Sequence, residues 1–379
     1  MDSILPADEF WMREALRLAA RAAGRTSPNP MVGAVVVKEG RKLSEGWHAG
    51  PGLPHAERVA LDQAGEEARG ATLYVTLEPC SHHGRTPPCV ERILDAGVAR
   101  VVAALRDPDP RVNGEGFRRL EEAGVQVVSG VLEREALLLN RGFVTRTLAG
   151  RPYVHLKLAQ SLDGKAATHL GESRWITSAE ARRGGHRLRS RVDAILAGIG
   201  TVLADDPLLT ARPPEGSPPR QPLRVVVDSL ARIPLTARCL RPAEAPVLVA
   251  ATTLAPAERV EALRAKGIDV WFAPPKEGRV DLAALVGELA RRGINELLVE
   301  GGPKLAGAFL DAGLVDEVHA FIAPLLIGGE GALPSVGGLG RGRLGEAVRL
   351  VDVRWEEAGS DLYVTGRVPR PFLSDGQDP

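Results

Sequence analysis

The sequence predicts an α/β protein made of two domains. Its 379 residues exceed what one hydrophobic core usually contains. Short apolar runs with strand character alternate with helical patterns along the chain, which is typical of layered α/β sheets. Two such series meet near Gly150, in the segment Leu148-Ala149-Gly150-Arg151-Pro152. We therefore expect a first domain over residues 1–148 and a second domain over residues 149–379.

The first series contains alternating strands and helices. Its strands are expected at Met31–Lys38, Lys42–Trp47, Thr72–Leu77, Arg100–Leu105 and Val125–Ser129. Its helices are expected at Phe10–Ala23, His55–Ala64, Cys89–Ala96, Gly116–Ala123 and Glu133–Thr147. Asp8 is placed to cap the first helix and Gly24 to end it.

The second series repeats this alternation over a longer stretch. Its strands are expected at Tyr153–Leu158, Ala194–Ala197, Arg224–Val227, Val247–Ala250, Asp269–Phe272, Glu296–Val299 and Glu317–Phe321. Helices are expected at Ala179–Arg191, Ala257–Ala265, Leu282–Arg292 and Pro303–Leu310. Leu350–Trp355 and Leu362–Val368 have the pattern of a closing antiparallel pair. The proline-rich stretch Arg212–Pro222 lies inside this series, so it is expected to be a surface loop.

Composition and charge exclude several classes of protein. Apolar residues make up 44% and charged residues 25% of the chain, which is ordinary for a folded domain and excludes wholesale disorder. Lys+Arg 48 balances Asp+Glu 48, so the chain lacks the basic excess of a nucleic-acid binder. No apolar run approaches the ~18 residues of a membrane span, and the N-terminus lacks a secretory signal. Three cysteines indicate a reducing compartment. We expect a cytoplasmic enzyme with no membrane or nucleic-acid partner.

Three segments of the first series carry residues that bind metals. His55-Ala56-Glu57 opens a helix, Pro79-Cys80 follows a strand, and Cys89 opens the next helix. One imidazole and two thiolates give zinc three ligands and leave a fourth position for water, whose pKa zinc lowers toward ~7. Glu57 points roughly 200° around the helix from His55, so it can act as a general acid/base without ligating the metal. Each residue alone could be an ordinary buried residue, but together they favour zinc.

The second series lacks the usual dinucleotide fingerprint. The run Gly198-Ile199-Gly200-Thr201-Val202-Leu203 fails at the third glycine of G-x-G-x-x-G. The run Glu300-Gly301-Gly302-Pro303-Lys304-Leu305 joins a strand to a helix, where glycines and a helix N-terminus can hold a pyrophosphate. Considered alone, this run could equally be a tight turn. Cys239 has no partner motif and is expected to be a small packing residue.

The pattern of the first series resembles the zinc-dependent cytidine/deoxycytidylate deaminase superfamily, whose signature is H-x-E followed by P-C-x-x-C. Here eight residues separate Cys80 from Cys89, and the sequence SPNPMVGAVVV occupies residues 27–37. Both features are similar to the deaminase half of the bifunctional riboflavin-biosynthesis family. The resemblance implies that Asn29 holds the pyrimidine or its sugar. The longer insert contains His82 and His83, which are rival ligands or substrate contacts.

The second half resembles the reductase domain of the same family, which has a dihydrofolate-reductase-like fold and binds NADPH. The resemblance rests on KLAQSLDGK at 157–165, GESRWIT at 171–177, GTVLADDPLLT at 200–210 and VDS at 227–229. It implies NADPH contacts from Ala159, Trp175, Thr201, Asp205, Ser229 and Gly302. It implies contacts to the phosphoribosyl-pyrimidine substrate from Ser173, Arg189, Leu209, Arg212 and Glu300. Asp205 is also a candidate for proton transfer.

The resemblance implies two successive reactions. The first half would deaminate an aminopyrimidine carrying a ribosyl phosphate, and the second half would reduce the ribosyl group to a ribityl chain with NADPH. A homo-oligomer is expected. Two alternatives stay open: a nucleic-acid base deaminase with an appended RNA-binding domain, and a zinc-stabilised structural domain on a nucleotide sensor. Zero net charge argues against the first alternative.

The choice between NADPH and NADH depends on one predicted strand end. Asp228 alone would favour NADH, because an acidic residue there normally binds the ribose 2′-hydroxyl. Ser229 and Arg232 favour NADPH, because a hydroxyl and a guanidinium can bind a 2′-phosphate. Together with the family resemblance, they lead us to expect NADPH.

Overall fold

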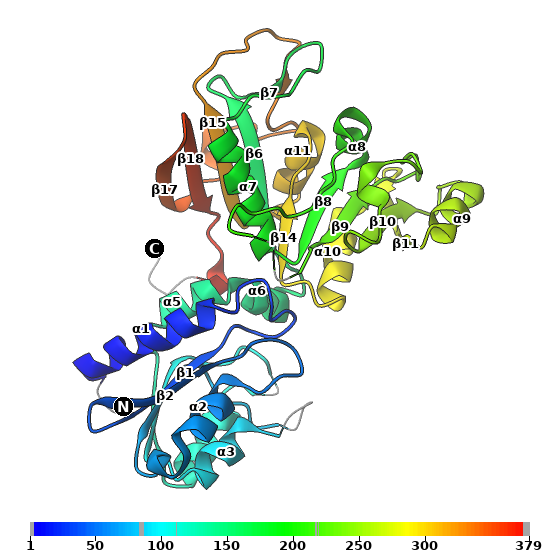
Figure 1. The fold of residues 1–379 in the computed structure, drawn as a ribbon. Helices are drawn as coiled ribbons and strands as arrows, with labels where there is room; N and C mark the ends of the chain where they lie inside the picture. Colours follow the sequence, from blue (N-terminus) through cyan, green and yellow to red (C-terminus); the bar gives the residue numbers. More distant parts are fainter. Residues whose placement is uncertain (1–3, 83–86, 111, 217, 219, 374–379) are drawn as a thin grey trace. The chain divides into compact units, whose positions relative to one another are not determined.

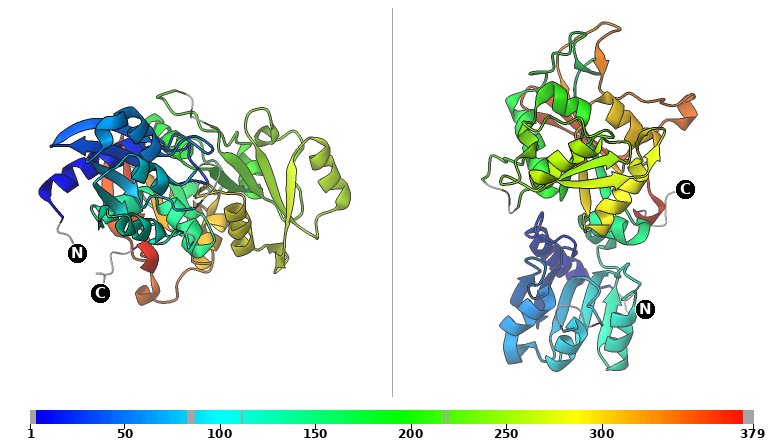
Figure 2. Two further views of the ribbon diagram at one scale, coloured as in Figure 1. Left: turned by 90° about the horizontal axis from the view of Figure 1, so that it is seen from below. Right: turned by 90° about the vertical axis from the view of Figure 1, so that its right-hand side faces the viewer.

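The computed structural model describes residues 4–82, 87–110, 112–216, 218 and 220–373. The chain forms two compact units that meet in sequence between Ala149 and Gly150 (Figure 1). Figure 2 shows helices against the sheets of these units from two further directions. None of the helices in the described ranges combines the length and the apolar character that a membrane crossing requires.

The first unit is built on a five-stranded sheet with the order β2-β1-β3-β4-β5. The strands are β1 (Gly33–Lys38), β2 (Arg41–Trp47), β3 (Thr72–Leu77), β4 (Arg100–Leu105) and β5 (Gln126–Ser129). Strand β1 is antiparallel to β2 and β3, whereas β3, β4 and β5 run parallel. The parallel half requires helical crossovers, which explains why helices alternate with these strands.

Helices cover both faces of this sheet. They are α1 (Pro6–Ala20), α2 (Ala56–Ala64), α3 (Cys89–Asp95), α4 (Glu115–Glu122), α5 (Glu133–Leu139) and α6 (Arg141–Ala149). Helices α1 and α5 lie against one face, and α2 and α3 against the other (Figure 1). The helices pack closely, because a Cβ added to Gly33 would lie 2.0 Å from the Ala15 carbonyl oxygen. A side chain at this position would therefore push α1 off the sheet.

Two predictions for the first unit are wrong. Asp8 does not cap α1 from outside; it is the third helical residue, and its carboxylate accepts a hydrogen bond from the Leu5 backbone N–H at 2.8 Å. Asp8 is buried there, where Tyr74 and Arg100 also donate to it. The helix predicted over Glu133–Thr147 is divided at Asn140, because the Asn140 amide hydrogen-bonds both the N–H and the C=O of Met31.

The second unit is built on a nine-stranded sheet with the order β11-β10-β9-β8-β14-β6-β15-β18-β17. Its strands are β6 (Tyr153–Ser161), β8 (Ala194–Gly198), β9 (Leu223–Val227), β10 (Val247–Thr252), β11 (Asp269–Ala273), β14 (Glu296–Val299), β15 (Glu317–Ala323), β17 (Val351–Ala358) and β18 (Asp361–Arg367). The strands from β11 to β15 in this order are parallel, and β18 and β17 close the sheet antiparallel. Two small ribbons pair β12 (Pro275–Lys276) with β13 (Arg279–Val280) and β7 (Lys165–Ala167) with β16 (Leu333–Pro334).

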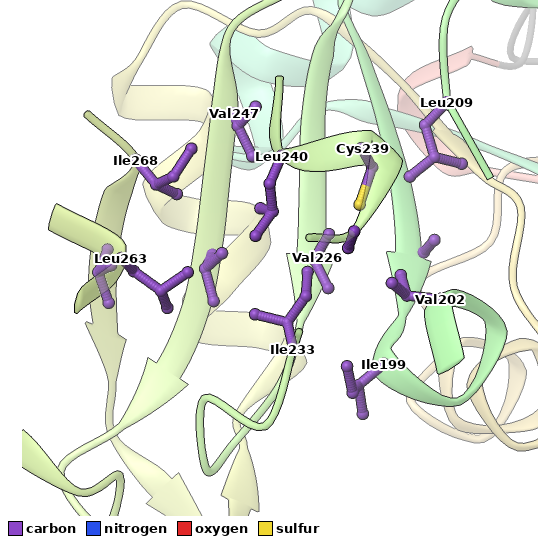
Figure 3. Close-up of a cluster of buried hydrophobic side chains, with 14 of the residues drawn as sticks. Ile199, Val202, Leu209, Val226, Ile233, Cys239, Leu240, Val247, Leu263 and Ile268 are labelled. Atoms are coloured by element: carbon purple, nitrogen blue, oxygen red, sulfur yellow. The ribbon is translucent and has the colours of Figure 1, made fainter. Parts of the chain in front are cut away.

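Alternate residues of the parallel strands enter two different cores. The helices are α7 (Ala179–Arg191), α8 (Ile199–Asp205), α9 (Ala257–Ala265), α10 (Leu282–Arg291) and α11 (Pro303–Asp311). On one face, Val249 belongs to a cluster with Leu263 of α9 and with Cys239. Figure 3 shows Leu263 and Cys239 in this cluster. On the other face, Leu248 packs in a cluster with Leu285 of α10 and Phe309 of α11. The packing role predicted for Cys239 is confirmed, and the α/β class is confirmed for both units.

The sequence missed only short elements of the second unit. Helix α8 was not predicted, because its seven residues follow β8 without a capping side chain. The strands of the two ribbons were also missed. The antiparallel pair at the end of the chain is confirmed as β17 and β18.

Candidate active sites

Three predicted metal ligands of the first unit lie together. His55 is the N-cap of α2, Cys80 follows β3, and Cys89 is the first residue of α3. His55 Nδ1 is 3.2 Å from Cys89 Sγ and 3.6 Å from Cys80 Sγ. The Cys89 backbone N–H donates to Cys80 Sγ at 3.3 Å, so the start of α3 directs a helix dipole at this sulfur. One nitrogen and two sulfurs at these separations fit the requirements of a zinc ion.

The ionisation of Cys80 also fits a cation site. Hydrogen bonds from Cys89 and His55 lower the pKa of Cys80 to about 4, although burial acts in the opposite direction. The hydrogen bond with Cys80 raises the pKa of His55 above its usual value. A hydrogen bond with Cys80, together with burial, raises the pKa of Cys89. Cys80 is therefore the thiolate of the pair, and a thiolate is the form of cysteine that binds metals.

Glu57 lies beside these three residues and is 3% exposed. Within the described part of the chain, its Oε2 atom has no hydrogen-bond partner. Burial raises the pKa of Glu57 above its ordinary value, and this effect exceeds the opposing effect of His55. A buried carboxyl group next to a metal centre, with one oxygen unbound, can accept and return a proton.

A second histidine connects Asn29 to the metal centre. The Asn29 amide nitrogen lies 3.0 Å from His48 Nε2, and His48 Nδ1 lies 3.1 Å from the Pro54 carbonyl oxygen. His48 Nδ1 therefore donates to Pro54, which leaves Nε2 to accept from Asn29. The ring centroids of His48 and His55 are 5.3 Å apart. Sequence reasoning missed His48, because an isolated histidine without a motif carries no signal.

Of the two histidines in the insert, the structure describes His82, and His82 does not join the metal group. Among the described residues, His55, Cys80 and Cys89 form the group in the first unit that could hold a metal, and His82 is not a member. His83, the other rival ligand, lies outside the described residues. A cavity of about 220 Å³ adjoins the centre, and its lining includes His55, Cys89, Arg58 and Arg92.

The predicted reductase contacts of the second unit gather at one edge of its sheet. Strands β6, β8, β9 and β14 are parallel, so their carboxyl ends meet at the edge where open α/β sheets bind ligands. Thr201 lies in α8 just after β8, and Gly302 is the N-cap of α11 just after β14. The Gly302 N–H donates to Thr201 Oγ1 at 3.0 Å, which brings two predicted cofactor contacts together.

Other predicted contacts form a second group at this edge. Ser173 Oγ donates to Asp205 Oδ1 at 3.3 Å, and Arg174 also pairs with Asp205. The side chain of Trp175 is 68% exposed, and the Arg182 guanidinium lies 4.4 Å from its ring centroid. Ala159 lies on β6, in the half of this strand near its carboxyl end.

Arg189 and Glu300, both predicted to contact substrate, bind each other. Arg189 donates to the two Glu300 oxygens at 2.7 and 2.6 Å. Lys157 Nζ lies 3.9 Å from Glu300 Oε2. Burial acts to raise the pKa of Glu300, but Arg189 and Lys157 outweigh it and hold this pKa at about 2. Glu300 is therefore a fixed anion, and Arg189 fixes its position.

Sequence reasoning gave Lys157 no role, although it lies on β6 beside Glu300. Burial lowers the pKa of Lys157, which makes this amine a better proton donor than an exposed lysine. Its position between two leucines in the middle of β6 was the signal that could have identified it.

The last two predicted substrate contacts differ in exposure. Arg212 is exposed, with Nη2 3.3 Å from His186 Nε2, so its guanidinium is accessible to an anion. The side chain of Leu209 is buried in the core (Figure 3). A ligand could therefore contact Leu209 only through its backbone.

The predicted contacts to the cofactor 2′-phosphate lie at the end of β9. Asp228 is fully buried, and its carboxylate accepts from the Ile233 N–H at 2.8 Å and from Arg232 Nε at 3.2 Å. This carboxylate stabilises the turn after β9, so it is already occupied. Ser229 Oγ accepts from the Val280 N–H at 3.1 Å, and its own hydrogen can still be donated.

Comparisons with known proteins identify the family of each part of the chain. Residues 5–105 match the cytidine and deoxycytidylate deaminase zinc-binding region, and residues 152–364 match the RibD C-terminal domain. The riboflavin biosynthesis protein RibD of Aquifex aeolicus is 45% identical over 359 residues, which cover 94% of this chain and 97% of that protein. The Escherichia coli protein of the same name is 48% identical and covers 85% of this chain, with 89% of its own length matched.

The solved structures that resemble this chain include members of the same family. Acinetobacter baumannii RibD has a TM-score of 0.85 at 38% identity, and the match covers 95% of this chain and 98% of that one. A Thermotoga maritima diaminohydroxyphosphoribosylaminopyrimidine deaminase/5-amino-6-(5-phosphoribosylamino)uracil reductase has a TM-score of 0.83 at 37% identity, covering 96% and 99%. These likenesses confirm the predicted fold class, a cytidine-deaminase-like first part and a reductase second part.

Proposed function

Because the chain belongs to the RibD family, we propose that it is a bifunctional deaminase/reductase of riboflavin biosynthesis. The first activity deaminates 2,5-diamino-6-ribosylamino-4(3H)-pyrimidinone 5′-phosphate. The second activity reduces 5-amino-6-(5-phosphoribosylamino)uracil with NADPH to the ribitylamino product. The observation that carries this proposal is the group of His55, Cys80 and Cys89 beside the buried Glu57.

In the deaminase reaction, His55, Cys80 and Cys89 would hold the zinc ion. Bound zinc supplies an activated water at neutral pH. Glu57 would take up a proton at Oε2 and return it to the departing amino group, because this oxygen has no hydrogen-bond partner among the described residues. The Asn29–His48 pair orients the pyrimidine, since the amide still offers a carbonyl oxygen and a second N–H to the substrate.

In the reductase reaction, NADPH supplies the hydride. The Gly302 loop and Thr201 would bind its pyrophosphate at the N-terminus of α11. Trp175 offers its exposed ring to the same cofactor. Ser229 and Arg232 would bind the 2′-phosphate, since Asp228 is already engaged by its own turn.

The substrate of the reductase would lie next to the charged group at Glu300. Glu300 offers carboxylate oxygens to sugar hydroxyls, and Lys157 lies within reach of the same oxygens. Arg212 would bind the substrate phosphate, because its guanidinium is accessible. Asp205 accepts from Ser173 and can pass a proton to the opening sugar.

The proposal assigns one activity to each domain, with deamination over residues 1–148 and reduction over residues 149–379. It includes a cytoplasmic location, which the three free cysteines support. It also includes a homo-oligomer and the absence of a nucleic-acid partner, and zero net charge supports the latter. Family membership favours it over a nucleic-acid deaminase or a structural zinc domain.

A coupled assay on the purified chain tests the proposal. The diaminopyrimidine substrate should release ammonia, and NADPH oxidation should follow only after this release. The Glu57→Gln variant should lose ammonia release while it keeps its zinc and still oxidises NADPH when the deaminated intermediate is added. Ammonia release without any subsequent NADPH oxidation would contradict the reductase assignment.

A further inference from the structure

A second cluster of metal-binding residue types lies in the second unit, away from the carboxyl edge of its sheet. His155 on β6 and His319 on β15 are both buried and lie on neighbouring parallel strands. His155 Nδ1 is 3.0 Å from His319 Nε2. The two imidazoles therefore direct one nitrogen each at the same point.

The carboxylate of Glu317 lies against both of these nitrogens. Its Oε1 is 3.5 Å from His319 Nε2, and its Oε2 is 3.8 Å from His155 Nδ1. A tetrahedral zinc ion with ligand distances of about 2.0–2.2 Å keeps neighbouring ligand atoms about 3.3–3.6 Å apart. The separation of the two nitrogens lies just below this range, and the two Glu317 oxygens, one facing each imidazole, lie within it and just above it. Among the described residues of this unit, these three form the group that could hold a metal ion.

The outer nitrogens of both histidines are held by further partners. His155 Nε2 lies 3.1 Å from Glu296 Oε2, and His319 Nδ1 lies 2.8 Å from the Tyr363 hydroxyl oxygen. Metal-binding histidines typically use their second ring nitrogen in this way, which fixes the ring and its tautomer. The Tyr153 hydroxyl also donates to Glu317 Oε2 at 3.1 Å. All three would-be ligands thus have the supporting hydrogen bonds that metal ligands usually have.

A proton relay without metal is the competing interpretation. Tyr363 could donate to His319, His319 to His155, and His155 to Glu296. In this relay Glu317 has no function toward His155, since 3.8 Å is longer than a hydrogen bond. The Tyr153 hydroxyl and His319 hold this carboxylate in place, and a metal ion would also join it to His155, because it would use all three groups as ligands.

We propose that His155, His319 and Glu317 form a second metal site, which binds a divalent cation of the zinc type independently of the cysteine-containing centre. Two imidazoles and a carboxylate suit zinc, and they also accept cobalt, nickel or copper. The carboxylates of Glu317 and Glu296 favour a positive ion at this position. A bound ion would cross-link β6 to β15 and stabilise the second unit, since it binds only the folded chain.

Metal titration of the full chain tests this proposal. The protein is freed of metal with a chelator and then titrated with Co²⁺, and separately with Zn²⁺. We expect two metal ions per chain. Cobalt bound to thiolates shows sulfur-to-metal charge-transfer absorption, whereas cobalt at His155, His319 and Glu317 would show only d–d bands. The two sites can thus be distinguished in one titration.

Variants assign each ion to its site. The Cys80→Ser/Cys89→Ser variant should keep one metal ion, without the charge-transfer band. The His155→Gln/His319→Gln variant should also keep one ion, with this band, and should still release ammonia. Glu296→Gln should weaken the second site about 10- to 100-fold. His169→Gln, which removes an exposed histidine of the same unit, should change nothing.

Wild-type protein that stays at one metal ion per chain in excess zinc and cobalt would overturn the proposal. The cysteine double variant provides an independent decision if the histidine variants fail to fold. If this variant binds no cobalt and gains no thermal stability from zinc, the cluster is a proton relay. This outcome leaves the proposed enzymatic function unaffected, because neither reaction uses these residues.

Discussion

Two buried glutamates, one in each unit, have pKa values that are shifted in opposite directions. Glu57 is 3% exposed in the first unit, and burial raises its pKa. Glu300 has an 8% exposed side chain in the second unit, yet its pKa is held at about 2. Burial acts to raise the pKa in both cases, so the difference comes from the neighbouring charges.

The neighbours of the two carboxyl groups explain this difference. Glu300 faces the fork of Arg189 and the amine of Lys157, which both stabilise its anion. Glu57 faces one imidazole and two sulfurs, and the Cys80 charge disfavours its anion. The comparison shows that burial together with two cations produces a fixed anion, whereas burial beside one imidazole and a thiolate raises the pKa of a carboxyl group, so that it can take up a proton.

The largest expected effect concerns proton exchange at Glu57. Glu57→Gln keeps the shape of the side chain but removes its ability to take up a proton. Ammonia release should fall by about 10²–10⁴-fold, the usual contribution of general acid–base catalysis. Steady-state assays and metal analysis measure this effect. The exposed Glu121→Gln is the matched control and should keep full activity; an active Glu57→Gln enzyme would show that another group moves the proton.

The next effect concerns the fixed anion. Arg189→Leu leaves Glu300 buried with Lys157 as its remaining cation in this group, and loss of one partner from a buried ion pair typically costs about 3–5 kcal/mol. The free energy of unfolding of the second unit should fall by this order, as measured by urea denaturation. Arg191→Leu removes an exposed arginine from the same helix and should have little effect. Equal losses for both variants would mean that the ion pair contributes nothing specific.

A smaller effect is expected where the second unit recognises a charge on its cofactor. Ser229→Ala/Arg232→Ala should raise the Michaelis constant for NADPH about 10- to 100-fold, because a charged hydrogen bond contributes about 1.5–3 kcal/mol. The constant for NADH should hardly change. Ser190→Ala/Arg191→Ala removes the same residue types from the end of α7 and serves as control. Similar increases for both cofactors would place Ser229 and Arg232 away from the 2′-phosphate.

The candidate metal ligands could be predicted from the sequence, because the motifs that contain them are local. His55, Cys80 and Cys89 lie within a short stretch, and each stands at the start of a helix or the end of a strand that sequence patterns predict. Strands such as Thr72–Leu77 and Glu296–Val299 are predicted with their observed bounds, because short apolar runs between turn residues identify them. Local sequence patterns therefore predict most of the helices and strands.

Contacts between segments that are distant in the sequence could not be predicted from local motifs. His155 and His319 are separated by 164 positions, and only the sheet order, which places β6 beside β15, brings them together. The break at Asn140 depends on a bond to Met31, which lies 109 positions away. The family resemblance named Arg189 and Glu300 separately, but their mutual pairing required the structure. Tertiary packing, which no local pattern encodes, decides such features.

The smallest expected effect is the pH dependence of the Glu300 contribution to stability. The folded-state pKa of about 2 lies below the ordinary value of 4.5, so the ionised form stabilises the fold. This contribution is fully present above pH 4.5 and is lost as the pH falls from 4.5 toward 2. The difference in unfolding free energy between wild type and Glu300→Gln should therefore be constant near neutral pH and shrink below pH 4.5. Urea denaturation at a series of pH values measures it, with the exposed Glu121→Gln as reference. A difference that grows on acidification would show that Glu300 is not the fixed anion that distinguishes it from Glu57.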